Sequence, residues 1–152
     1  PSPCYVNEGA DYNGGFSPAE IDGILEMMDR NFVGWSEFFA PVAMSNPDRP
    51  ELATSLTRTF CANDPEIARQ FAEVTFRSDS RPLLPKVRVP TAIPHCAFDA
   101  IVPDAVAEYL HRSIPGSTLR IIPSLGHMPH VSHPEETAAA ISEALRDVAG
   151  VR

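Results

Sequence analysis

The sequence has few cysteines, few basic residues and no long hydrophobic run. Its three cysteines, Cys4, Cys61 and Cys96, are odd in number and form no C-x-x-C pair. This argues against a disulfide framework or a zinc knuckle and favours reduced thiols in the cytoplasm. Lys and Arg number 12 against 20 Asp and Glu, a net charge of −8, which argues against nucleic acid or anionic lipid as a partner. No apolar run approaches the roughly 20 residues that span a bilayer, and no signal peptide is visible.

The chain divides into regions by its local patterns. Residues 1–16 are irregular and rich in Pro and Gly. Residues 17–80 contain four helical patterns that begin near positions 17, 31, 48 and 64. At the first of them, Ser17 and Glu20 have the spacing of a capping box around Pro18. Four consecutive helices joined by short turns predict one all-α unit.

Residues 81–152 alternate between strand and helix. The β-like runs lie at 91–96 and 118–122, and a helical pattern follows each of them, the first opening at Pro103. This order is typical of a parallel sheet. Because parallel sheets are covered by helices on both faces, two strands do not form one alone, and we expect partner strands from sequence outside this chain. Pro94 removes a ladder hydrogen bond from the first strand, which predicts a bulge or a shortened pairing there.

An acid and a histidine follow the two expected strands. Asp99 comes after the first run, and His127, preceded by Gly126, comes after the second. In α/β-hydrolases the chain order is nucleophile, acid, histidine. The acid binds one ring nitrogen of the histidine so that the other can act as a base. A simpler interpretation is that Asp99 caps a turn and His127 is an ordinary loop residue. No Gly-x-Ser-x-Gly turn, which would hold the nucleophile, occurs in the sequence.

Other groups of reactive side chains give weaker signals. His127, His130 and His133 stand at three-residue intervals, but prolines interrupt them and no carboxylate or cysteine has a matching position. We therefore expect no metal and interpret His130 and His133 as hydrogen-bonding loop or cap residues. Cys96 lies beside the acid loop and is interpreted as a buried strand thiol rather than a nucleophile.

Aromatic side chains concentrate in the four-helix region. They are Trp35, Phe38, Phe39, Phe71 and Phe76. A helical core is the simplest explanation for any one of them. A helical insert placed before the acid strand would also overhang the catalytic site, where aromatic side chains can form the wall of an apolar pocket. Both interpretations stay open, and each can hold for different residues.

Several short motifs run in order along nearly the whole chain. They are Ser2-Pro3-x-Tyr5, Tyr12-Asn13-Gly14-Gly15-Phe16, Asn31-Phe32-Val33-Gly34-Trp35, Phe39-Ala40-Pro41, Phe76-Arg77-Ser78-Asp79-x-Arg81, Val87-x-Val89-Pro90, Asp99 with Pro103, and Gly126-His127-x-Pro129-His130-x-Ser132-x-Pro134. In these motifs the chain resembles the sigma-B regulator group of α/β-hydrolases, the RsbQ-like proteins, whose plant relatives are the strigolactone and karrikin receptors. The match covers only the second half of that family's sequence. The nucleophile serine and the oxyanion-hole amides belong to the absent half, and Pro94 departs from the β-formers usual in the acid strand.

The resemblance implies an α/β fold and names the residues of a site. The expected fold is the C-terminal half of an α/β-hydrolase fold, two parallel strands with flanking helices, preceded by a four-helix lid. It implies Asp99 as the triad acid and His127 as the triad base, with no metal or organic cofactor. The side chains assigned to substrate binding are Trp35, Phe39, Phe76 and Met128.

Three functions fit these patterns. The family hydrolyses small hydrophobic esters or butenolide-like lactones, so the first is a serine hydrolase, whose part present here lacks the nucleophile and is expected to be inactive alone. The second is a ligand-sensing receptor or stress-response regulator of the same fold, with slow or no turnover and a regulatory protein that docks on the lid. The third is a short product with a binding or scaffolding role. The two expected strands argue against it, because a parallel sheet requires further strands.

Overall fold

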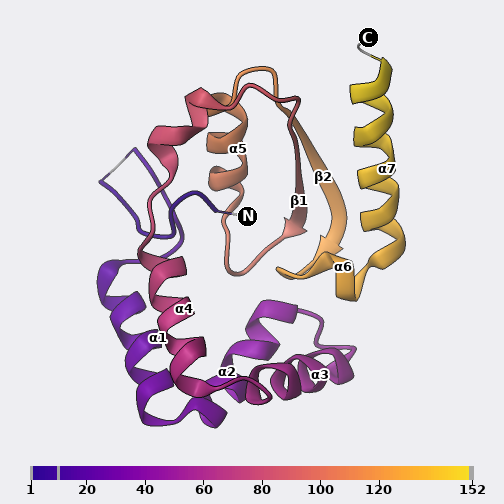
Figure 1. The fold of residues 1–152 in the computed structure, drawn as a ribbon. Coiled ribbons are helices and arrows are strands. Elements are labelled where there is room, and N and C mark those ends of the chain that lie inside the picture. Colours follow the sequence, from indigo (N-terminus) through magenta and orange to yellow (C-terminus); the bar gives the residue numbers. More distant parts are fainter. Residues whose placement is uncertain (1, 10, 151–152) are drawn as a thin grey trace.

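The computed structural model describes residues 2–9 and 11–150, with the backbone only at 148–150. Its elements are α1 (Pro18–Arg30), α2 (Phe32–Met44), α3 (Pro50–Cys61), α4 (Pro65–Arg77), the 3₁₀ helix η1 (Arg81–Lys86), β1 (Ala92–Phe98), α5 (Asp104–Ser113), β2 (Thr118–Leu125), α6 (Pro129–Ser132) and α7 (Pro134–Gly150). The four helices α1 to α4 lie together at one end of the molecule, and the two strands with α5 and α7 lie at the other (Figure 1).

Local capping explains where the first helices begin. The Ser17 hydroxyl accepts a hydrogen bond from the backbone N–H of Glu20, and the Glu20 carboxylate accepts the N–H of Ser17 at 2.7 Å, as predicted. This pair satisfies two backbone donors that no helix bond can reach. At α4, the carboxylate of Asp64 accepts the N–H of Ile67 at 3.2 Å and that of Glu66 at 2.9 Å. Proline occupies the first position of α1, α3 and α4, where its fixed φ suits the helix and its missing N–H is not needed.

The two ends of the four-helix unit meet. The backbone N–H of Ser80 donates to the carbonyl of Pro3 at 2.8 Å. Arg81 donates to Glu8 at 2.6 Å and to Asp79 at 2.7 Å, and its guanidinium lies 4.6 Å from the centre of the Tyr12 ring. The irregular N-terminal region is therefore bound to the segment that leads from α4 to η1. The chain thus enters and leaves the four-helix unit through segments that contact each other.

The sheet has two parallel strands, in agreement with the predicted fold class. Ala92 pairs with Thr118 and Phe98 with Leu125, and the register shifts between Cys96 and Phe98. Successive side chains alternate between the two faces of a strand. Helix α5 covers one face and α7 the other, and the carboxyl ends of both strands point toward the four-helix unit (Figure 1).

The position predicted for the strand irregularity was wrong. Pro94 pairs in register with Arg120, and the bulge lies beyond Cys96. Thr91 accepts a hydrogen bond from the N–H of Thr118 at 2.9 Å. Backbone groups of successive residues point alternately to the two sides of a strand, so Pro94 directs its missing N–H to the free edge of β1. The proline therefore costs no hydrogen bond to β2.

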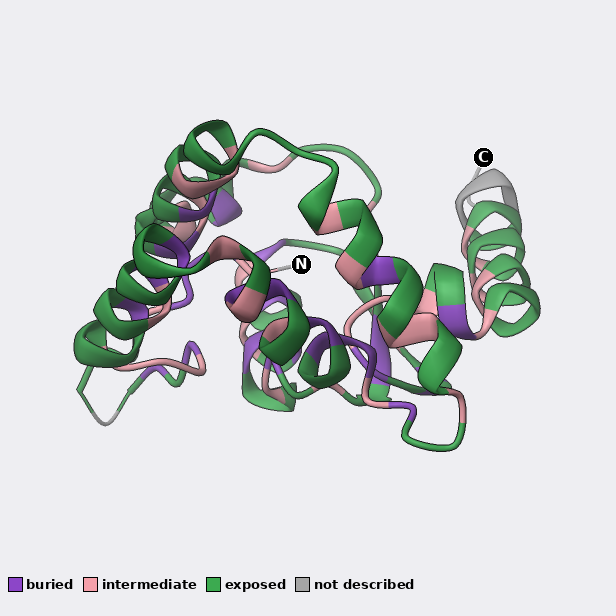
Figure 2. Ribbon diagram, turned by 90° about the horizontal axis from the view of Figure 1, so that it is seen from below, coloured by how far each residue is buried: buried purple, intermediate pink, exposed green. Residues whose placement is uncertain are grey.

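Buried residues fill the space between the helices and the sheet. Fully buried side chains include Ile21 and Leu25 of α1 and Val106 of α5. Seen from below, exposed residues lie on the outer sides of the helices and buried ones face inward (Figure 2). Among the helices in the described ranges, none combines the length and the apolar character that a bilayer crossing requires.

Candidate active site

Asp99 and His127 meet where the two strands end. Asp99 follows β1 and His127 follows β2, and the histidine Nδ1 lies 2.8 Å from the Asp99 Oδ2. The other carboxylate oxygen, Oδ1, accepts the backbone N–H of Ile101 at 2.8 Å and that of Val102 at 3.0 Å. Asp99 therefore caps its own turn and contacts the histidine at the same time.

The environment of Asp99 favours its ionised form. Burial alone would raise the pKa of this carboxyl, whose side chain is only 6% exposed. The hydrogen bond and the charge of His127, together with the N–H groups of Ile101 and Val102, outweigh burial and lower the pKa below its ordinary range. An ionised carboxylate can only accept, so the Nδ1 of His127 carries the proton. When the ring is neutral, the acceptor is therefore Nε2, on a side chain that is 29% exposed.

The loop of His127 has a conformation that requires glycine. Gly126 has a φ of +87°, and a Cβ built on it would lie 1.9 Å from the carbonyl oxygen of Met44. Its N–H donates to the carbonyl of Phe98 at 2.8 Å. The next N–H, that of His127, donates to the carbonyl of Ala43 at 2.7 Å. The loop after β2 is thus bound to the end of β1 and to the last turn of α2.

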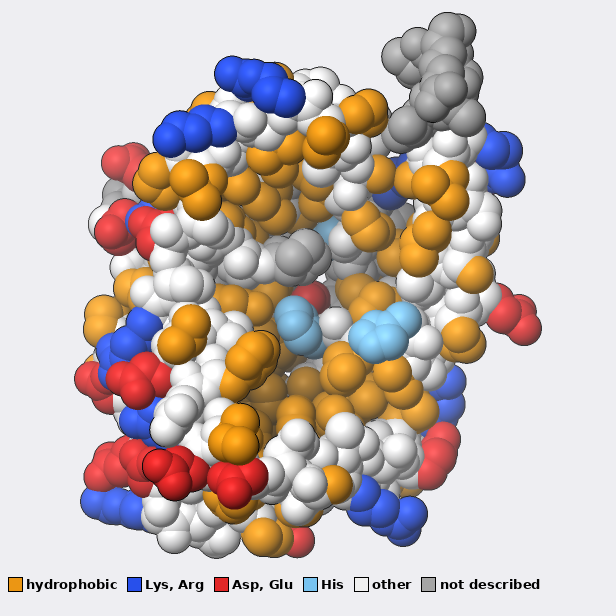
Figure 3. Space-filling model, in the orientation of Figure 1, with side chains coloured by type: hydrophobic (Ala, Val, Ile, Leu, Met, Phe, Trp, Pro, Cys, Tyr) orange, Lys and Arg blue, Asp and Glu red, His pale blue; other side chains and the backbone are white. Residues whose placement is uncertain are grey.

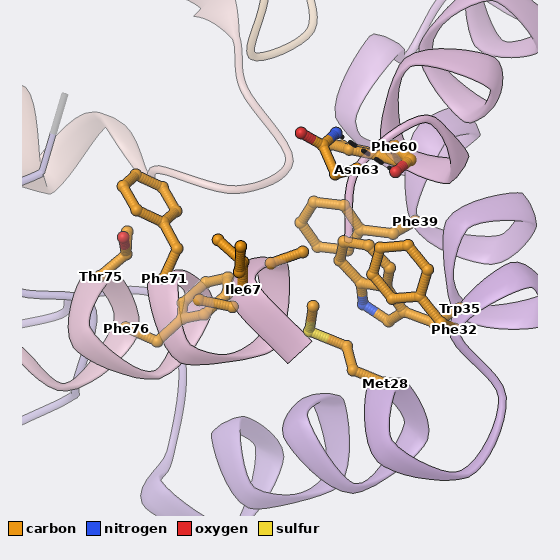
Figure 4. A pocket seen from close by; sticks show the side chains of 12 residues that line it. Met28, Phe32, Trp35, Phe39, Phe60, Asn63, Ile67, Phe71, Thr75 and Phe76 are labelled. Carbon is orange, nitrogen blue, oxygen red and sulfur yellow. Dashed lines mark hydrogen bonds between the residues drawn. The ribbon is translucent and has the colours of Figure 1, made fainter. Parts of the chain in front are cut away.

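An aromatic cavity of about 480 Å³ opens within the four-helix unit (Figure 4). Trp35 stacks on Phe32 and on Phe39, with ring centres 5.4 and 5.3 Å apart, and Phe60 of α3 lies 5.1 Å from Trp35. Phe71 of α4 lines the opposite side. The buried indole N–H of Trp35 has no hydrogen-bond partner among the described residues. The cavity is therefore mostly apolar, and Asn63 and Thr75 are the polar side chains in its lining.

The predicted substrate-binding residues fall into two groups. Trp35, Phe39 and Phe76 line the aromatic cavity. Met128 does not line it; it packs against the hydrophobic core and precedes the first residue of α6. Asp99 and His127 are also absent from the cavity wall. On the face of the molecule seen in Figure 3, histidine side chains lie among hydrophobic ones, between the four-helix unit and the sheet.

The aromatic residues separate by burial. Trp35 and Phe76 are buried, whereas Phe71 is 73% exposed and still lines the cavity. Phe38 is 60% exposed and does not line the aromatic cavity. The interpretation of Phe38 as a residue of the helical core was therefore wrong. Its neighbour Phe39 faces the cavity because one residue turns the side chain by about 100° around a helix of 3.6 residues per turn.

Sequence reasoning missed several residues beside the site. Phe32 and Phe60 belong to the cavity wall, and the spacing of Phe32, Trp35 and Phe39 along one helix face was the available signal. Tyr5 packs against Phe76, with ring centres 5.2 Å apart. Burial raises the pKa of Tyr5, and the charge of Asp99 adds to the effect.

The other two histidines of the three-residue series and Cys96 lie outside the contact between Asp99 and His127. His133 follows α6, and its Nδ1 lies 2.8 Å from the hydroxyl of Ser132. His130 is exposed on α6. Cys96 is buried in β1, as predicted, and burial raises the pKa of its thiol. Over the ranges 2–9 and 11–150, no group of three or more His, Cys, Asp or Glu side chains is arranged to hold a metal ion.

Comparison with known families and proteins extends over most of the chain. Residues 6–140 match the model described as the alpha/beta hydrolase family. A strigolactone esterase of Pisum sativum is 36% identical over 145 residues, which are 95% of this chain and 54% of that protein. A karrikin insensitive 2 receptor of Petunia hybrida is 36% identical over 135 residues, 88% of this chain and 50% of the receptor. The chain spans about half the length of the curated relatives it matches.

A solved structure supports the same fold. A hydrolase from Oleispira antarctica superposes with a TM-score of 0.89 and 35% sequence identity. The match covers 95% of this chain and 54% of the Oleispira chain. The elements described here therefore correspond to one half of a larger hydrolase fold.

Proposed function

Because the chain belongs to the α/β-hydrolase family, we propose that it supplies the acid and the base of a serine hydrolase. The proposed substrates are small hydrophobic esters or lactones. The observation that carries the proposal is the contact of 2.8 Å between His127 Nδ1 and Asp99 Oδ2. It makes Nε2 the basic nitrogen of the neutral ring. The substrate class is supported by a relative that is named as an esterase and by the apolar cavity.

The proposed reaction is acyl transfer through a serine. A serine from polypeptide outside these 152 residues attacks the ester or lactone carbonyl. His127 takes the serine proton at Nε2 and gives it to the leaving oxygen, while Asp99 holds the ring in the required tautomer and stabilises the imidazolium. A water, which gives up a proton to His127, then attacks the acyl-serine, the carboxylic acid is released, and the serine regains its proton. Without the serine, acid and base give almost no acyl transfer, because the members of a triad act as a unit.

The four-helix unit is proposed as the lid over this site. It lies at the carboxyl ends of β1 and β2, where both members of the dyad are placed (Figure 1). The aromatic cavity suits the apolar acyl or ring portion of a substrate. The expected location in the cytoplasm rests on the three free thiols.

A second candidate is a ligand-sensing receptor. The identity of 36% to a karrikin insensitive 2 receptor favours it. In this proposal the same dyad and cavity capture the ligand with slow or no turnover, and a regulatory protein docks on the lid. Rapid turnover, together with no protein retained by the ligand-loaded protein in a pull-down, would contradict this candidate.

A chimaera tests the proposed hydrolase. The 152-residue chain is joined to the half of the Oleispira antarctica hydrolase that the match leaves uncovered. Hydrolysis of short p-nitrophenyl esters and of an aryl-substituted butenolide is then measured. We expect His127→Ala and Asp99→Asn each to lower kcat by on the order of 10⁴-fold, since each removes one member of the triad.

The matched control is His130→Ala, which removes an exposed histidine three residues away on α6. It is expected to keep the activity of the parent chimaera. An active chimaera whose kcat survives His127→Ala would sink the assignment of the base, whatever the substrate.

A further inference from the structure

The loop that carries His127 is bound to the turn between two lid helices. We call residues 43–49, from the end of α2 to the start of α3, the hinge segment, and residues 125–132 the histidine loop. The N–H of His127 donates to the carbonyl of Ala43 at 2.7 Å. Gly126 lies so close to Met44 that no side chain fits between them. These two segments, far apart in sequence, therefore meet at the histidine itself.

Asn46 in the hinge segment uses its whole amide in this contact. Its side chain is buried, with 7% of the residue exposed. The Nδ2 group donates to the carbonyl of Met44 and, at 3.2 Å, to that of Leu125, and Oδ1 accepts from Arg49 at 2.8 Å. A carboxamide has two N–H donors and an acceptor oxygen, so both donors of Asn46 are satisfied by backbone carbonyls. A buried polar group with all its partners is held in one orientation.

Arg49 reaches the far end of the histidine loop. Its Nη2 donates to the carbonyl of Ser132 at 2.7 Å. Leu125 and Ser132 lie on either side of His127 along the chain, so Asn46 and Arg49 together bind the loop before and after the histidine. Helices α2 and α3 are already joined by the packing of Trp35 on Phe60. The bonds of Asn46 to Leu125 and of Arg49 to Ser132 add a connection from the hinge segment to the loop.

We propose that Asn46 and Arg49 are positioning residues that hold His127 where its Nδ1 meets Asp99. The proposal rests on the proposed function, because it concerns the same dyad. Gly126 leaves the loop without a side chain of its own at the point where φ is +87°, and such a segment needs external contacts to keep one conformation. The lid thus supports the base of the site as well as covering it.

The test observes the proton on Nδ1 of His127 directly. In the ¹⁵N-labelled 152-residue chain, NMR detects a ring proton that a hydrogen bond to Asp99 shifts downfield and protects from exchange with water. Asn46→Asp keeps the shape of the side chain but turns oxygen toward the carbonyls of Met44 and Leu125. We expect this variant to lose the downfield resonance, or to exchange its proton on the order of tenfold faster.

Two further variants separate positioning from folding. Arg49→Gln removes the bond to Ser132 and is expected to weaken the same resonance without placing a carboxylate against carbonyls. Asn63→Asp is the matched control, since the Asn63 amide also donates to two backbone carbonyls, of Thr59 and Phe60, at the end of α3. It is expected to leave the resonance unchanged. The ring signals of His111, which lies 3.1 Å from the Ser117 hydroxyl, report whether each variant is folded.

The outcomes divide the two proposals. A wild-type chain that is folded by the His111 signals but has no protected Nδ1 proton contradicts the dyad and with it the proposed function. A wild-type chain with this proton, which folded Asn46→Asp and Arg49→Gln variants both keep, overturns the positioning role and leaves the dyad standing. Loss in either folded variant, with retention in Asn63→Asp, supports the positioning role. If Asn46→Asp does not fold, Arg49→Gln decides alone.

Discussion

At the scale of single residues, Asp99 divides its two carboxylate oxygens between two tasks. Oδ1 accepts the backbone N–H groups of Ile101 and Val102, and Oδ2 accepts from His127. The backbone bonds orient the carboxylate independently of the histidine. The imidazole therefore meets an acceptor that is already in place, which is the preorganisation that the proposed role of His127 as a base requires.

The lowered pKa of Asp99 gives a prediction for acid stability. A carboxylate whose pKa is lower in the folded than in the unfolded protein stabilises the fold above the unfolded value, and this stabilisation is lost as the pH falls through the folded value. Asp99→Asn should lower the free energy of unfolding at pH 7 by about 1–3 kcal/mol. It should also flatten the loss of stability below about pH 4. Urea unfolding between pH 3 and pH 7 measures both effects.

The control for this experiment is the exposed Asp48, which lies outside the dyad and is changed to Asn in the same background. Its variant should follow the wild-type pH dependence. An Asp99→Asn protein with the same acid profile as the wild type would show that the carboxylate is not held in its ionised form by the dyad.

At the residue scale, the contact between Asp99 and His127 could be predicted from the sequence, because its signal is local. The acid and the histidine each follow a strand, and Gly126 announces a tight loop before His127, so their meeting could be anticipated from chain order. Asn46 and Arg49 carried no such signal, because their partners Leu125 and Ser132 are backbone carbonyls some 79 and 83 residues away. Every residue has a backbone carbonyl, so a hydrogen bond to one cannot be inferred from the type of the residue that carries it.

At the scale of elements, the last turn of α2 lies against the loop after β2. The positive φ of Gly126 and the nearby carbonyl of Met44 exclude every side chain at this point. The four-helix unit and the loop after β2 are thus in contact through backbone atoms. The separation between the last turn of α2 and the histidine loop leaves no room for a side chain at position 126.

A glycine substitution tests this contact. Gly126→Ala should destabilise the protein by about 3 kcal/mol or more, because left-handed strain adds to an overlap with the Met44 carbonyl. Gly116→Ala is the matched control: its φ is +70°, and a Cβ there meets nothing within 4 Å. It should cost only about 1–2 kcal/mol, the strain alone. Thermal unfolding of both variants compares them, and equal losses would contradict the close contact.

Element boundaries were predictable where they depend on capping. Ser17 and Asp64 begin α1 and α4 where the sequence places them, because a capping side chain bonds to its own helix. The bulge in β1 was placed wrongly at Pro94, because which edge of a strand loses a hydrogen bond depends on the neighbouring strand. The short helices η1 and α6 were not predicted; each spans only a few residues and depends on tertiary contacts.

At the scale of the whole molecule, the sheet is narrow for the apolar surface it carries. Within the described residues β1 pairs only with β2, which leaves a free edge on β1. Phe98, Ile121 and Leu125 are exposed at or near the carboxyl ends of the strands. Such a surface favours association with further polypeptide, either the missing strands or a second copy of the chain.

Self-association of the 152-residue chain should therefore depend on this face. Ile121→Lys places a charge on the exposed side of β2 and is expected to shift the chain toward monomer at concentrations where the wild type associates. Leu83→Lys is the control, because Leu83 is on η1, away from the sheet, and has the same 57% exposure as Ile121. Sedimentation velocity over a range of concentrations gives the comparison. Equal effects of the two substitutions would show that general charge, and not this face, governs association.

The hydrogen bond between Ser80 and Pro3 has a consequence for the evolution of this molecule. A segment whose two ends touch behaves in a gene as an insertion, since its length and composition can change while the separation of its ends stays the same. The residues that bind the histidine loop, from Ala43 to Arg49, lie within this segment and must be kept. The rest of the helical insert can change in length and composition while β1 and β2 keep their pairing.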